Sequence, residues 1–131
     1  MRRVFGTIFV IVILVNLFML FGSSGEPAIR PKMGEVTDPI LLPVIEQLAD
    51  AIDANQSNPK LRMELGMTYE GATLNKLAES IYRQYTSQFP ERIIGWYRMA
   101  IVQQRMGKLE KAIQTLMEGA KYAPPKMVAP H

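Results

Sequence analysis

The chain has 131 residues, 15 basic and 12 acidic, with a net charge of +3 near neutral pH. It contains no cysteine, which excludes disulfides, thiol catalysis, zinc–thiolate sites and haem attached through paired cysteines. Its only histidine, His131, belongs to a short tail, and no basic patch with interleaved aromatic residues indicates nucleic acid, so we expect no cofactor, metal or catalytic site.

The first predicted element is a transmembrane signal-anchor helix within residues 1–21. Residues 4–21 form an apolar run of eighteen residues without a charge. As a helix this run rises about 27 Å, close to the roughly 30 Å thickness of the hydrocarbon core of a bilayer. Because Arg2 and Arg3 precede it, we expect a cytoplasmic N-terminus and a periplasmic or lumenal remainder. The alternative is a cleaved signal peptide with its cleavage site at 22–25, but the apolar run is longer than the usual signal core.

Residues 22–38 are predicted to form a flexible linker. They combine Gly, Ser, Pro and charged residues without helical periodicity. As a coil this segment reaches about 23 Å, which would keep the following domain near the membrane surface.

The segment after the linker contains an internal repeat with a period of 34 residues, seen when residues 59–92 are aligned with 93–126. Small residues recur where antiparallel helices must approach closely. A proline closes each block, because proline lacks a backbone donor and ends a helix. The residues predicted to pack the repeats are Leu65, Gly66, Tyr69, Ala78, Tyr82 and Pro90 in the first block, and Trp96, Ala100, Ala112 and Pro124 in the second.

This pattern predicts an all-α repeat domain over residues 39–126, followed by a tail at 127–131. The predicted helices are 39–55, 59–71, 74–88, 93–106 and 109–122, with Gly71 and Gly107 marking turns. The first of these helices corresponds to the second helix of a preceding repeat. The linker takes the place of that repeat's first helix, so about two and a half hairpins are expected.

The repeated residues resemble the tetratricopeptide repeat, whose unit carries an early tryptophan, Leu-Gly, tyrosine, alanine, a large residue, alanine and proline. Residues 59–92 match through LRMELGMTY, Ala78, Tyr82 and Pro90, with Arg62 at the tryptophan position and Tyr85 at the second alanine. Residues 93–126 match through Trp96, Ala100, Gly107, Ala112 and Pro124, with Gln103 at the tyrosine position. The resemblance covers roughly half of the chain and implies an α–α superhelix.

In tetratricopeptide proteins the first helix of each repeat lines a concave partner-binding groove. The resemblance implies that this groove is lined by Lys60, Met63, Met67, Glu70, Ile94, Tyr97, Ile101 and Gln104. Repeats that clamp a terminal carboxylate carry lysine, arginine and asparagine there, so the apolar residues present disfavour clamping. Methionine suits irregular apolar contacts with a peptide or helix, although these methionines could instead fill the domain's own core.

The predicted array is short, and we expect no polar capping helix after Tyr122 because the following APPKMVAPH is too rich in proline, whereas such arrays usually need about three units and a cap. The last helix should therefore leave surface near Met117 and Tyr122 open to a partner. We expect a non-enzymatic, membrane-anchored interaction module, an accessory or scaffolding subunit of a larger membrane complex, with respiratory and photosynthetic electron-transfer complexes as examples by analogy. The alternatives are a transient assembly factor or chaperone, for example in cytochrome c maturation, and an oligomer that forms through open ends.

Overall fold

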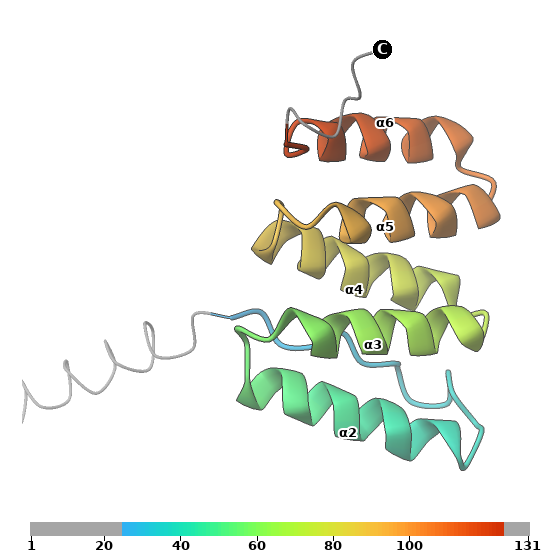
Figure 1. Cartoon of the computed structure of the whole chain (residues 1–131). Coiled ribbons are helices and arrows are strands. Elements are labelled where there is room, and N and C mark those ends of the chain that lie inside the picture. Colours follow the sequence, from blue (N-terminus) through green and yellow to red (C-terminus); the bar gives the residue numbers. More distant parts are fainter. Residues whose placement is uncertain (1–24, 125–131) are drawn as a thin grey trace, which may run out of the picture.

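The computed structural model describes residues 25–124, which form a stack of five α-helices without a strand (Figure 1). The helices are α2 (Leu41–Ala54), α3 (Pro59–Gly71), α4 (Asn75–Gln88), α5 (Ile93–Arg105) and α6 (Leu109–Ala120). Their bounds lie within two residues of those predicted. The expected all-helical fold is thus confirmed for this part of the chain.

The predicted anchor at residues 1–21 and the tail at 127–131 lie outside the described residues. Among the helices from α2 to α6, none is long and apolar enough to cross a bilayer.

The 34-residue period of the sequence is also the period of the helices. α2, α4 and α6 begin at residues 41, 75 and 109, and α3 and α5 begin at 59 and 93. Each helix packs on the next one along the chain, most extensively within the hairpins α3–α4 and α5–α6. Two complete hairpins therefore follow the single helix α2.

The turns inside the hairpins follow the same period but use different residue types. Gly107 after α5 has φ 78°, and its counterpart after α3 is Thr73, with φ 59°. A β-branched residue is strained in this left-handed region, where glycine is not. Gly71, which was predicted to mark the first turn, is instead the last residue of α3. The helix ends there, and the left-handed position comes two residues later.

The core lies between successive helices and contains most of the predicted repeat-packing residues. Leu65, Tyr69, Ala78 and Tyr82 are inaccessible to solvent, and Ala100 and Ala112 are 4% and 5% exposed. Pro90 and Trp96 are half-buried, joined by a hydrogen bond from the indole N–H to the proline carbonyl, and Pro124 is exposed.

Gly66 is buried against an aromatic ring. A Cβ atom at this position would lie 2.2 Å from Cε1 of Tyr82, so the absence of a side chain is what allows α3 and α4 to approach.

Candidate interaction surfaces

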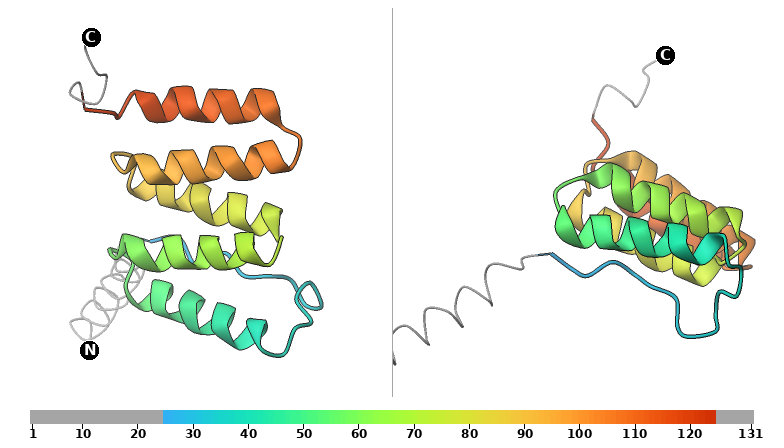
Figure 2. Two further views of the ribbon diagram at one scale, coloured as in Figure 1. Left: turned by 45° about the vertical axis from the view of Figure 1, so that its right-hand side comes forward. Right: turned by 90° about the horizontal axis from the view of Figure 1, so that it is seen from below.

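Residues 25–32 form an extended segment, here called the strap, that runs alongside the helices in both views of Figure 2. Its main chain is held by side chains from three helices. The N–H of Ala28 donates to Asp53 of α2, and the carbonyls of Pro27 and Ile29 accept from Gln84 of α4 and Tyr69 of α3.

The strap therefore differs from the flexible linker that the sequence predicted. Ala28 is 6% exposed and Val36, just beyond the strap, is 8% exposed, so both belong to the core. The physical reason is that helix side chains satisfy the backbone of this segment and the core accepts its small apolar side chains.

Arg62 of α3 fixes the N-terminal end of the strap. Its side chain is fully buried and donates to the carbonyl of Glu26 at 2.6 Å. It also donates to the amide oxygens of Gln56, Gln84 and Gln88, at 2.9, 3.4 and 2.8 Å. Burial lowers the pKa of Arg62 from its ordinary value, opposed by the charges of Glu26 and Asp53, but an arginine stays protonated in proteins.

Arg30 ties the exposed side of the strap to α2. Its guanidinium lies 2.7 Å from Asp53 and 2.9 Å from Asp50. Burial alone would raise the pKa of Asp53, but the N–H of Ala28 and the guanidinium of Arg30 outweigh it, and the pKa is lowered.

Acid should loosen this end of the strap. Because the folded-state pKa of Asp53 is lowered, the carboxylate's contribution to stability is complete above about pH 4 and is lost as the pH falls through the lowered pKa. Urea unfolding of the full chain would be measured at neutral pH and at a pH below the lowered pKa of Asp53. Between these two conditions Asp53→Asn should lose less stability than the wild type. An equal loss in both proteins would contradict the proposed contact.

The groove residues expected from the family resemblance lie on α3 and α5, and most of them reach solvent. Met67, Ile94 and Tyr97 are 44%, 46% and 54% exposed. Lys60 and Gln104 are also exposed, whereas Met63 and Ile101 are half-buried. This surface, the α3/α5 face, is thus mixed, with part of Met63 belonging to the core.

Glu70 was expected to face a partner in the groove, but its side chain is only 7% exposed. It accepts the hydroxyl of Tyr82 and lies 3.6 Å from Arg98 and 2.8 Å from Arg105, both on α5. Glu70 therefore joins the two hairpins, and its charge is already satisfied within the chain.

The last helix carries a row of exposed apolar side chains, here called the α6 row. Its members Leu109, Ile113, Leu116 and Met117 are 58%, 50%, 46% and 65% exposed. Their spacing places them on one face of α6, because residues three and four apart are neighbours on a helix. The nearby Tyr122 is 46% exposed and stacks on Trp96, with ring centroids 5.7 Å apart.

Two of these four positions are covered one repeat earlier, in α4, whereas Arg83, the counterpart of Met117, is 56% exposed. Tyr82, which corresponds to Leu116, is inaccessible, and Glu79, which corresponds to Ile113, is 8% exposed. In α4 the following hairpin covers this face, whereas in the described residues no helix follows α6. The prediction of open surface near Met117 and Tyr122 agrees with these exposures.

No family model matches the sequence, and no curated protein does. Within residues 25–124 the fold is an all-helical, repeat-like bundle whose last helix, α6, exposes an apolar row.

Proposed function

We propose that this protein is a non-enzymatic interaction module that binds another protein against the open end of its helical stack. The observation that carries the proposal is the α6 row, whose side chains are about half exposed, although Tyr82 and Glu79, the α4 counterparts of Leu116 and Ile113, are buried. Contiguous exposed apolar surface of this kind is typical of interaction sites. A helix of the partner would complete the stack in the way that α5 completes it for α4.

The proposed setting is a membrane. The support is the apolar run at residues 4–21, preceded by Arg2 and Arg3, which would place the repeat domain in a periplasm or lumen. The protein would then be an accessory or scaffolding subunit of a larger membrane complex, with electron-transfer complexes of respiration or photosynthesis as candidates by analogy alone. Membership of the tetratricopeptide family is part of the proposal, supported by the 34-residue period of the helices.

Charges placed in the α6 row should detach the partner. We expect the full chain, isolated in mild detergent from membranes of its source, to bring down a stoichiometric companion. Ile113→Glu combined with Met117→Glu should reduce recovery of that companion at least tenfold, because two carboxylates would have to be desolvated in the interface. Both side chains are half or more exposed, so the fold should persist.

The matched control places the same charges on the α3/α5 face, as Ile94→Glu with Tyr97→Glu, and should leave recovery unchanged. A wild-type chain that runs alone on native gels would overturn the proposal.

A transient assembly factor or chaperone is the second candidate, favoured by the exposed Met67, Ile94 and Tyr97 on the α3/α5 face. It would bind client segments there and be absent from the finished complex. In that case the control variant, and not the α6 variant, would lose its companion.

A further inference from the structure

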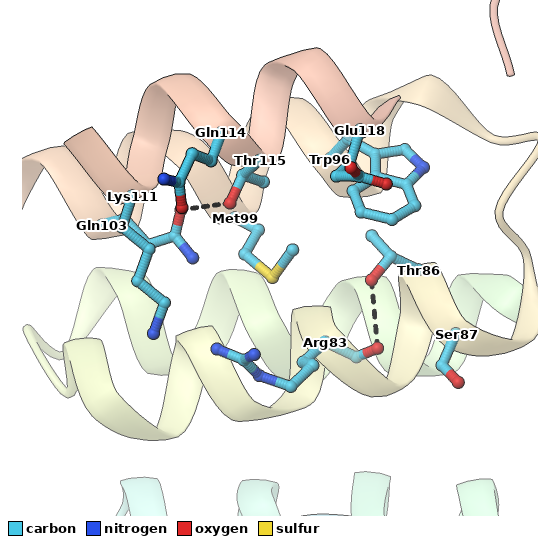
Figure 3. Close-up of a pocket in the computed structure, with 10 residues that line it drawn as sticks. All are labelled: Arg83, Thr86, Ser87, Trp96, Met99, Gln103, Lys111, Gln114, Thr115 and Glu118. Atoms are coloured by element: carbon cyan, nitrogen blue, oxygen red, sulfur yellow. Dashed lines mark hydrogen bonds between the residues drawn. The ribbon is translucent and has the colours of Figure 1, made fainter. Parts of the chain in front are cut away.

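A groove of about 390 Å³ lies where α4, α5 and α6 meet (Figure 3). Trp96 and Met99 of α5 provide apolar wall, and Ser87 of α4 and Thr115 of α6 add hydroxyl groups. Lys111 lies at the end of the groove opposite Trp96 (Figure 3). The volume falls within the range of about 300–1,000 Å³ that is usual for ligand pockets.

This groove is the counterpart, one 34-residue period later, of the place where the strap lies. The correspondence pairs Ser87 with Asp53, Trp96 with Arg62, Gln103 with Tyr69 and Glu118 with Gln84. Each of the four earlier residues donates to, or accepts from, a main-chain group of the strap. The same arrangement of three helices therefore occurs twice, once holding an extended segment and once with no described residue of the chain inside it.

The strap shows what kind of chain such a groove accepts. Its occupant is extended, its backbone is bound by helix side chains, and a small residue, Ala28, points into the core. A helix would need far more width than this single extended segment.

The charges of the two grooves differ in sign. Asp53, which binds Arg30 of the strap, corresponds to the uncharged Ser87 of the second groove. Conversely, two buried apolar residues of the first groove, Ala49 and Leu77, correspond to the cations Arg83 and Lys111 of the second.

These cations exceed the negative charge beside them. Arg83, Lys108 and Lys111 each lie 3.5 Å from the same carboxylate, that of Glu79, and are 56%, 43% and 44% exposed. Glu118, whose carboxylate lines the groove, is paired with Lys121 at 2.8 Å. The Lys111 end of the groove thus keeps surplus positive charge facing solvent.

We propose that the groove between α4, α5 and α6 binds an extended acidic peptide segment of a partner protein, in the manner in which the strap occupies the preceding groove. The charge argues against two other occupants. The strap of a second copy would bring Arg30 and Lys32 toward Arg83 and Lys111, and the chain's own residues 125–131 contain Lys126 and no acidic side chain.

Trp96 is the only tryptophan of the chain and lines the groove, so its fluorescence reports binding in the full-length protein. The probes are two synthetic peptides: the strap sequence EPAIRPKMG, residues 26–34, and the acidic version EPAIEPEMG, which carries Arg30→Glu and Lys32→Glu. We expect the acidic peptide to change the fluorescence saturably, with a Kd at least tenfold lower than that of the strap peptide. Its binding should weaken as salt is raised, because the contacting charges are partly exposed.

The variant that tests the site is Arg83→Glu with Lys111→Glu, which should reverse the preference between the two peptides. Lys60→Glu, an exposed lysine of α3, is the control and should change neither Kd. If the double variant does not fold, the salt dependence of the wild-type chain supplies the readout.

Four results would overturn the proposal. They are the absence of a saturable change with either peptide, tighter binding of the strap peptide, salt-independent binding of the acidic one, and binding only after residues 125–131 are deleted. Tighter binding of the strap peptide would assign the groove to the strap of another copy of the chain. Binding only after the deletion would assign it to residues 125–131 of the same chain. Because none of these results involves the α6 row, the proposed function is tested separately.

Discussion

Arg62→Ala should lower the free energy of unfolding by about 3–5 kcal/mol, the usual cost of truncating a large, fully buried side chain to alanine. The guanidinium holds together α3, α4 and the strap through four hydrogen-bond acceptors. Its loss leaves these acceptors without their donor and opens a cavity beside them. The strap should detach first, because its Glu26 carbonyl is bound by this side chain.

Urea unfolding of the full-length chain, followed by circular dichroism in the same detergent for each variant, measures this effect. Lys60→Ala, two residues earlier on the same helix and exposed, should stay within about 0.5 kcal/mol of the wild type. A loss below about 1 kcal/mol for Arg62→Ala would mean that the buried cluster contributes little.

Gly66→Ala should destabilise the chain by about 1–3 kcal/mol, the usual cost of overpacking a core. The new Cβ would lie 2.2 Å from Cε1 and 2.7 Å from Cζ of Tyr82, whose ring is fully buried and whose hydroxyl donates to Glu70. The ring cannot move aside without breaking that hydrogen bond. This cost exceeds the gain of up to about 1 kcal/mol that alanine brings to a helix.

Gly71→Ala is the matched control, because it lies on the same helix and a Cβ there meets nothing within 4 Å. It should be neutral or slightly stabilising in the same urea unfolding. If both glycine variants behaved alike, the close approach of α3 and α4 would not depend on Gly66.

The helices could be predicted from the sequence because their signals are local. Apolar periodicity and Pro59 at the start of α3 lie within single segments, and the 34-residue register repeats such segments along the chain. The exposed end of α6 followed from counting repeats. Neither inference needs knowledge of which side chains meet.

The strap could not be predicted, because its order comes from residues far away in the chain. Its Gly, Pro and charged residues have the composition of a spacer, and its partners Tyr69 and Gln84 lie 40 and 57 residues from the groups that they bind. Arg62 could be noticed only as a departure from the repeat pattern. The available signal was a cation at a core position, since a charged group is buried only when other groups of the protein bind it by hydrogen bonds or ion pairs.

Glu70 shows the converse limit. Its position on the first helix of a repeat favoured a partner-facing role, but its partner Arg105 lies 35 residues later and takes up its charge. The position of a residue within the repeat predicts which side of a helix it occupies. It does not show whether another helix already binds that residue.

The central claim, that another protein covers the open end of the stack, is tested most directly by photo-crosslinking in native membranes. A photoreactive amino acid placed at Ile113 or Met117 should form an adduct with one partner protein, whereas the same probe at the exposed Lys60 should not. The claim would be contradicted if the α6 positions gave no adduct, or adducts only with a second copy of this chain.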